Sequence, residues 1–170
     1  NALFSDYLRY GGLPLRFSLE EISVEPYLSD TYDAIVFKDI LQRNKLNDSA
    51  LLNLLLSFLM DNIANPFSAR SIVSALAANG IRTSVDTVLA YIGYIKNAMI
   101  MNSVQRYDIK GKKLLAAGEK YYAVDLGLRN VIKSSPETDF NKLYENLVYL
   151  ELLSRGYDIK VGKTDNYEID

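Results

Sequence analysis

Apolar positions along the chain predict helices first and short strands later. In "EPYLSDTYDAIVFKDILQRN" (Glu25–Asn44) apolar residues recur at helical spacing, which predicts an amphipathic helix. The next run, "SALLNLLLSFLMDNIA", is apolar on almost every side and predicts a centrally buried helix that ends at Pro66. Before Glu25, Gly and Pro residues break an aromatic-rich opening. Residues 1–48 are therefore expected to form a helical connector.

Two more helices and a hairpin are predicted after the buried helix. Ser68 is a suitable N-cap for "ARSIVSALAANG", and Ser84 is a suitable N-cap for "VDTVLAYIGYIKNAMI". Two β-rich runs, Ser103–Tyr107 and Lys120–Val124, then enclose a turn rich in Gly and Lys. Three helices followed by a hairpin predict a winged helix-turn-helix domain over residues 49–125.

The last segment, residues 126–170, predicts a short helix, a long helix and two strands. Asp125 is expected to cap the short helix, and "FNKLYENLVYLELLSRG" predicts the long one. "YDIKVG" predicts a strand and "YEID" the start of another, with Gly162-Lys163 as the hairpin turn between them.

Composition places the chain among soluble globular proteins and restricts its chemistry. Apolar residues make up 49% of the 170 residues, charged residues 24%, and the net charge is −2. The absence of Cys, His and Trp excludes thiol nucleophiles, Cys/His zinc sites and Ser-His-Asp triads. We find no signal peptide and no apolar run of membrane-spanning length, so a cytoplasmic location is expected. The opening on Asn1 leads us to expect a piece of a longer protein.

The tripeptide "GKT" (Gly162–Thr164) resembles the end of a phosphate-binding loop. The full motif G-x-x-x-x-G-K-[ST] requires a glycine at position 157, which is Tyr157 here. The residues that follow predict a turn and a strand, whereas the motif needs a helix N-terminus to bind phosphate. No ATP site is expected within the chain.

Basic residues concentrate in the predicted winged domain, where six stand against two acidic ones between positions 96 and 123. The candidate nucleic-acid contacts are Lys96, Arg106, Lys110, Lys112 and Lys113. The last three lie at the predicted tip of the wing, where they suit a DNA backbone. The predicted recognition helix starts with Ser84, Val85 and Asp86, and no early Arg or Gln is present to read bases. DNA contact and a structural or protein-docking role both remain open.

Two carboxylates form a candidate metal site. Glu145 lies on the predicted long helix and Asp170 on the last predicted strand, an arrangement that brings two carboxylates toward one divalent cation. Phosphodiester hydrolysis needs a further acidic residue and a Lys on a following strand, which lie outside these residues. The alternative is that both are solvated surface residues, as acidic residues on helices and strands usually are. Taken alone, Glu151 and Glu168 would suggest a metal site equally well. No catalytic residue is assigned beyond this candidate pair.

Several motifs, taken in order, resemble one known family. They are "YLRYGGLP" (Tyr7–Pro14), "FKDI" (Phe37–Ile40), "KYYAVDLGLRN" (Lys120–Asn130), "ENLVYLELLSRGYDIKVGK" (Glu145–Lys163) and "EID" (Glu168–Asp170). Together they resemble the C-terminal region of a large prokaryotic family of AAA+-type P-loop ATPases. In that family an ATPase domain comes first, and the last portion is restriction-endonuclease-like.

The resemblance implies an α+β, mainly helical fold, with a winged helix followed by a truncated restriction-endonuclease-like α/β segment. It implies that ATP and Mg²⁺ are bound by an upstream ATPase domain of the same chain, while this region is regulatory and not itself catalytic. Glu145 and Asp170 match the acidic pair of the nuclease-like core. Asp125 and Asn130 belong to a family motif, and Asp39 either anchors its helix to the winged domain or faces the ATPase domain.

The implied partners are the ATPase domain, DNA or another protein, with no membrane. Two alternatives remain: an ATP-gated, metal-dependent nuclease, and a pure protein-interaction scaffold.

Overall fold

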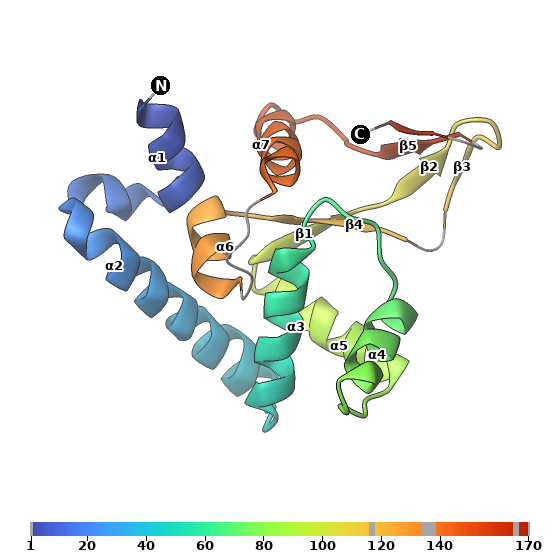
Figure 1. Ribbon diagram of the computed structural model, residues 1–170, viewed down its shortest axis with the longest axis horizontal. Coiled ribbons are helices and arrows are strands. Elements are labelled where there is room, and N and C mark those ends of the chain that lie inside the picture. The colour runs from blue at the N-terminus through green and yellow to red at the C-terminus, as the bar shows by residue number, and fades with distance from the viewer. Residues whose placement is uncertain (1, 116–117, 134–138, 165–166, 170) are drawn as a thin grey trace.

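The computed structural model describes residues 2–115, 118–133, 139–164 and 167–169. Over these residues the fold is α+β and mainly helical, with seven α-helices and two small sheets (Figure 1). The predicted α+β, mainly helical class is confirmed.

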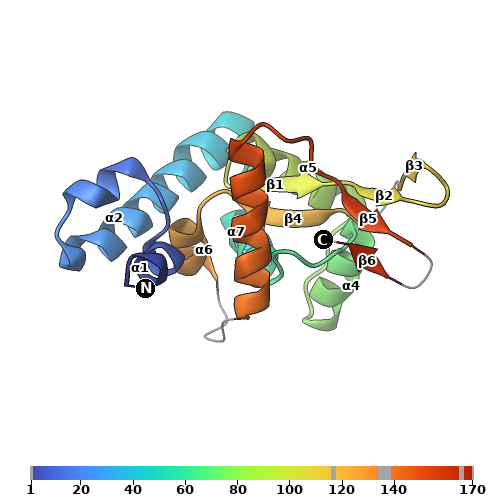
Figure 2. The same ribbon diagram turned by 90° about the horizontal axis from the view of Figure 1, so that it is seen from above.

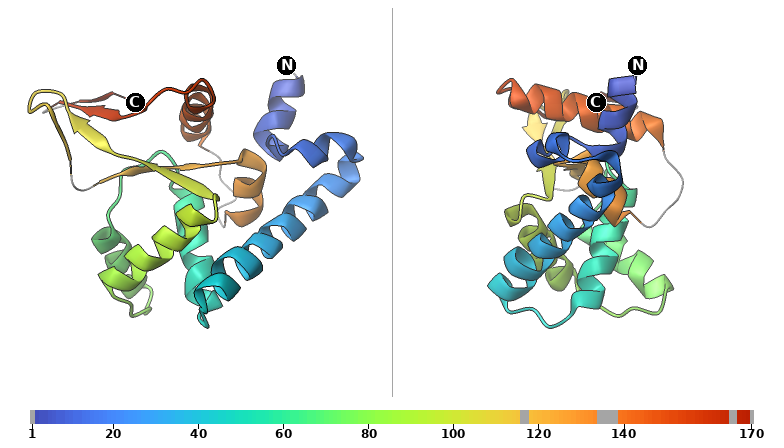
Figure 3. Two further views of the ribbon diagram at one scale, coloured as in Figure 1. Left: turned by 180° about the vertical axis from the view of Figure 1, so that it is seen from behind. Right: turned by 90° about the vertical axis from the view of Figure 1, so that its left-hand side faces the viewer.

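The N-terminal part consists of α1 (Ala2–Tyr10), a short 3-10 helix η1 (Pro14–Ser18) and a long rod. The rod comprises α2 (Glu21–Ala34) and a π-helical continuation, η2 (Ile35–Gln42). Figure 3 shows it running from beside α1 to the far end of α3. The sequence placed the start of this helix at Glu25, and the structure places it at Glu21. Val24 and Leu28 are both buried, so the earlier turn packs on the core and Pro26 lies inside the helix.

The central part contains α3 (Ser49–Asp61), α4 (Ala69–Ala78) and α5 (Val85–Asn97). The side chains of Asp48, Ser68 and Ser84 each accept a hydrogen bond from the backbone N–H three residues on. The predicted caps Ser68 and Ser84 are confirmed. Each cap satisfies one N–H that the first turn of a helix leaves unpaired.

Two small sheets follow. Strands β1 (Met101–Val104) and β4 (Lys120–Ala123) pair antiparallel, with Met101 opposite Ala123. The second sheet has the order β3-β2-β5-β6. Its strands are β2 (Arg106–Asp108), β3 (Lys113–Leu114), β5 (Val161–Lys163) and β6 (Glu168–Ile169).

Gly162 and Lys163 lie within β5, so the predicted hairpin turn at these residues is wrong. The turn starts at Thr164, whose backbone N–H bonds to the carbonyl of Tyr167 at 2.8 Å. Gly162 is instead flanked by Ile169 and, in parallel, by Tyr107 of β2. This parallel pairing places strands from the predicted winged segment and the predicted third segment in one sheet. The boundaries at residues 48 and 125 stay predictions.

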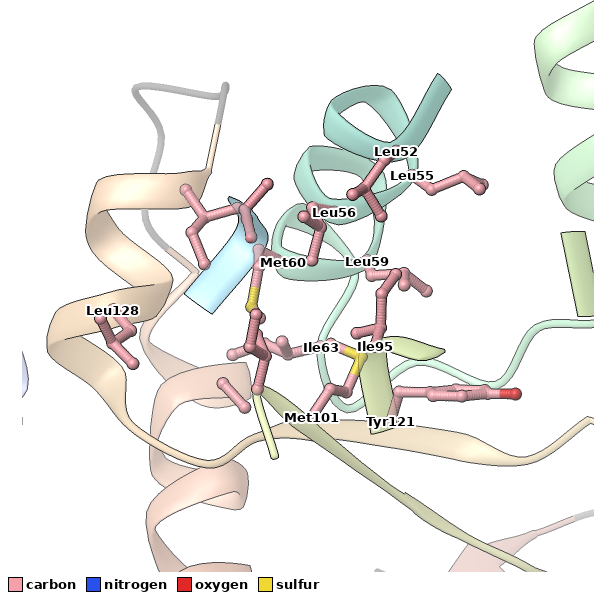
Figure 4. Close-up of a cluster of buried hydrophobic side chains, with 14 of the residues drawn as sticks. Leu52, Leu55, Leu56, Leu59, Met60, Ile63, Ile95, Met101, Tyr121 and Leu128 are labelled. Carbon is pink, nitrogen blue, oxygen red and sulfur yellow. The ribbon is translucent and has the colours of Figure 1, made fainter. Parts of the chain in front are cut away.

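Helices α6 (Leu126–Ile132) and α7 (Phe140–Ser154) lie between β4 and β5 along the chain. Helix α3 lies at the centre of the main core, where Leu52, Leu56 and Leu59 are fully buried. Figure 4 shows these side chains packed toward Ile95 of α5 and Met101 of β1. Burying each such side chain contributes about 1.5–3 kcal/mol, which explains why this helix is apolar on almost every side.

Candidate functional site

One contact in the fold joins the turn after α1 to the start of α6. The Gly12 backbone N–H donates to Asp125 Oδ2 at 2.7 Å, while Asp125 Oδ1 accepts from the N–H three residues on, at 2.9 Å. Gly11 has φ +72°, and a Cβ there would lie 2.2 Å from Asp125 Oδ1. A Cβ on Gly127 would lie 2.2 Å from the carbonyl oxygen of Tyr10. The predicted cap at Asp125 is confirmed, and the two glycines allow a close approach of the two segments.

Two further residues of the same motif extend this contact. Asn130 Nδ2 donates to the carbonyls of Leu8 and Arg9, both at 2.9 Å, and so provides a donor to two carbonyls near the end of α1. Arg129 Nε donates to the carbonyl of Met60 at the end of α3, at 3.2 Å. Burial lowers the pKa of the Arg129 guanidinium below its ordinary value. The motif residues Asp125, Arg129 and Asn130 thus hold three helices together.

A second cluster of charged side chains surrounds Lys120 on β4. Its ammonium lies 3.0 Å from Glu145 Oε1 of α7 and 2.9 Å from Glu168 Oε1 of β6. Glu145 Oε1 also accepts from the Tyr122 hydroxyl at 2.7 Å, and Glu168 Oε2 lies 2.7 Å from Arg106 of β2. The Lys120 side chain is only 4% exposed. A cation so deeply buried requires charged partners, and the two glutamates supply them.

An aromatic pair supports this cluster. The ring of Tyr149 on α7 stacks on Tyr122 with centroids 4.2 Å apart, and burial raises the pKa of the Tyr149 hydroxyl. The cluster therefore joins β2, β4, β6 and α7, so the two sheets meet there.

The predicted acidic pair is only partly placed. Glu145 lies on α7 as expected, but Asp170 lies outside the described residues. Within the described ranges, no three Asp or Glu side chains are grouped to share a metal ion. The Glu145–Asp170 metal site stays a prediction. The described partners of Glu145 are the Lys120 ammonium and the Tyr122 hydroxyl.

Sequence reasoning missed the roles of Lys120 and Glu168. The Glu168 side chain is 25% exposed and bridges two cations. One signal was present: Lys120 opens the predicted strand "KYYA", whose other residues are aromatic or apolar, and the structure buries all four. Lysine in a fully buried strand indicates an internal ion pair.

The predicted nucleic-acid contacts fall into two groups. Lys110, Lys112 and Lys113 are exposed together on the β2–β3 hairpin, which projects from the end of the molecule away from α1 (Figures 1 and 2). Lys96, also exposed, donates to the Ser103 hydroxyl at 2.6 Å. Arg106 of β2 forms an ion pair with Glu168 of β6, which balances its charge within the four-stranded sheet.

The exposed positions of α5 are not basic at its start. Asp86, Leu89 and Ala90 face solvent in its first two turns, and Leu89 is 53% exposed. This face offers a carboxylate and apolar groups to an approaching partner.

A groove of about 890 Å³ lies between α1, α2, α6 and α7. Its apolar lining includes Leu8, Leu28 and Leu143, and the Arg9–Glu25 ion pair, 2.9 Å long, lies at its edge. No local pattern predicts this groove, because four separate helices form its walls. Among the described residues no helix combines the length and the apolar character needed to cross a membrane.

These features define an α+β, mainly helical domain in which the motif residues Asp125, Arg129 and Asn130 join helices. The chain belongs to the family described as "Domain of unknown function (DUF8612)", which matches residues 1–139. No solved structure matches the chain.

Two relatives are similar over nearly the whole chain. An uncharacterized protein of Haemophilus influenzae is 36% identical over 168 residues, which is 99% of this chain and 42% of the relative. The uncharacterized protein MJ1544 of Methanocaldococcus jannaschii is 24% identical over 171 residues, covering 98% of this chain and 38% of the relative. The chain thus spans about two fifths of these relatives, which carry further chain outside it.

Proposed function

We propose that this domain is the recognition region of a longer, predicted AAA+-type ATPase and that it contacts DNA phosphates through the β2–β3 hairpin. The observation that carries the proposal is the set of three exposed lysines on a hairpin that projects from the rest of the molecule. In this proposal ATP and Mg²⁺ bind to another domain of the longer protein, because "GKT" lies in a strand and the turn after it.

The order of the elements supports a winged helix. Three capped helices, α3, α4 and α5, precede β1, and β1 pairs antiparallel with β4. The chain between these strands forms the β2–β3 hairpin, which occupies the position of a wing. In such domains the wing contacts the backbone while a helix approaches the groove.

The charge of the hairpin favours contact with phosphate over recognition of bases. Lys110, Lys112 and Lys113 provide three cations, and the first turns of α5 provide Asp86 and no Arg. Three phosphate contacts release counterions, so the logarithm of affinity should fall with the logarithm of salt with a slope of about −2.7. Binding is therefore expected to depend strongly on salt and weakly on sequence.

The test compares two triple variants. Lys110, Lys112 and Lys113 are replaced by Ser, and the matched control replaces Lys38, Arg43 and Lys45, which are exposed on and after η2. Each set removes three positive charges and includes one residue at positive φ, Lys112 or Lys45. Affinity for a short DNA duplex is measured by fluorescence anisotropy across a series of NaCl concentrations.

The hairpin variant should lose most of the affinity, and its salt slope should fall in magnitude by about 2.7, while the control binds nearly as the natural chain does. Equal losses in both variants would attribute binding to net charge. A natural chain whose binding does not respond to salt would contradict the proposal.

A protein-interaction scaffold is the second candidate, and the exposed face of α5 favours it. Asp86 is exposed on this face beside Leu89, and its carboxylate repels DNA phosphates, so the face suits a protein partner better than DNA. If the hairpin variant retains all measurable functions of the longer protein while Leu89→Glu removes them, the scaffold explanation replaces DNA contact.

A further inference from the structure

An exposed apolar ridge runs along α7 and continues onto α1. Phe140, Tyr144 and Val148 follow one another at intervals of four residues, and are 56%, 45% and 58% exposed. Phe4 of α1 stacks on Tyr144 with ring centroids 6.1 Å apart, and Phe140 lies 6.2 Å from Tyr144. Residues four apart share a helix face, so these side chains form one surface, here called the α7 ridge.

The α7 ridge is continuous with the groove between α1, α2, α6 and α7. Phe140 belongs to both, and the groove behind it is lined by Leu8, Leu28 and Leu143. Figure 2 shows α7 lying across the top of the molecule with α1 beside its N-terminal half. Contiguous exposed apolar surface of this kind marks an interaction site, whereas single exposed apolar residues do not.

We propose that the α7 ridge and the groove bind an amphipathic helix from the remainder of the same polypeptide. The walls of the groove are helices, which suits a helix that inserts apolar side chains at spacings of three and four residues. The two relatives carry more than half of their length outside the matched region, so a covalently linked occupant is available. The Arg9–Glu25 pair at the edge offers both signs of charge to the polar face of such a helix.

A linked occupant also explains how so much apolar surface is tolerated. A tethered segment binds at a high effective concentration, so a modest interface suffices to keep the surface covered. This inference rests on the proposed function only in taking the chain to be part of a longer ATPase.

The absence of Cys allows a direct test. Val148→Cys introduces a single thiol on the α7 ridge, and Ala78→Cys introduces one at the exposed end of α4 as the control. The rate of maleimide labelling at each site is measured by peptide mass spectrometry in the 170-residue chain and in the complete natural protein that carries it. Docking should slow labelling at position 148 by about tenfold or more in the complete protein, while position 78 labels equally in both.

Equal labelling of position 148 in the two proteins would overturn the inference. Protection within the 170-residue chain that increases with its concentration would also overturn it, because a second copy would then cover the ridge. DNA binding and ATP hydrolysis are measured on the same preparations. If the complete protein shows no DNA binding or no ATP hydrolysis, the proposed function is contradicted. The labelling result then still decides whether a helix docks on the α7 ridge.

Discussion

At the scale of single residues, two glycines and one aspartate determine how the N-terminal segment meets α6. Asp125 accepts hydrogen bonds from its own helix and from Gly12, so its carboxylate is fixed in position. Gly11 lies directly against that carboxylate at a positive φ. The position therefore excludes a side chain for two reasons, the backbone conformation and the contact.

Replacing Gly11 by Ala should destabilise the fold by about 2–4 kcal/mol, which combines left-handed strain with partial loss of the Asp125 cap. The control is Gly80→Ala, because Gly80 has φ +79° and open space around its Cβ position. That variant should destabilise the fold by only about 1–2 kcal/mol, because it adds left-handed backbone strain alone. Urea denaturation followed by circular dichroism measures both. Equal costs would mean that the Asp125 contact is unimportant.

The sequence predicted the residue-scale features that depend on local chain alone. Ser68, Ser84 and Asp125 each act on an N–H three residues away, so capping could be inferred from their position before an apolar run. The ion pairs of Lys120 could not be inferred, because Glu145 and Glu168 approach it only when α7 and β6 are folded over β4. The same reasoning assigned Arg106 to a DNA surface, although Glu168 engages it in the fold.

At the scale of elements, one buried amide holds α7 against β4. Asn146 is fully buried, and its side chain accepts from the Ala123 N–H at 2.8 Å and donates to the Ala123 carbonyl at 3.0 Å. The amide thereby takes the place of a neighbouring strand at the edge of β4. Both backbone groups would otherwise be buried without partners.

Asn146→Ala should therefore destabilise the fold by about 2–4 kcal/mol, because a buried donor and a buried acceptor both lose their partners. Asn141→Ala, in the exposed first turn of the same helix, should change stability by less than about 0.5 kcal/mol. Hydrogen exchange provides a local readout: the Ala123 amide should exchange faster in Asn146→Ala than in the control. An unchanged Ala123 rate would contradict the assigned role.

The helices were predictable at this scale, and so were strands that overlap β5 and β6, but the pairing of these strands with β2 was not. Helices α3, α4, α5 and α7 follow from apolar period and caps, which are properties of one segment. Strand β5 spans only Val161–Lys163 and pairs in parallel with β2, a contact between distant segments that no local pattern encodes. The turn predicted at Gly162-Lys163 was wrong for this reason, since pairing with β2 extends the strand.

At the scale of the whole molecule, the described core is shared by all three segments that the sequence suggests. The main cluster of buried apolar residues runs from Leu8 in α1 through Leu52 in α3 to Leu143 in α7. The four-stranded sheet also combines β2 with β5 and β6. Segments that share one core are expected to unfold together.

We therefore predict one cooperative unfolding transition for the 170-residue chain. Calorimetry should show a single peak, and circular dichroism and tyrosine fluorescence should give the same midpoint, since the chain has 13 Tyr and no Trp. Gly11→Ala lies in the first segment and Asn146→Ala in the third, and each should lower that one transition, by roughly 2–4 °C per kcal/mol for a domain of this size. Two peaks, or a variant that moves only one of them, would show instead that α1 and α7 belong to separate folding units. The contacts of Asp125 with Gly12 and of Asn146 with Ala123 argue against that separation, because each joins an outer segment to the central one.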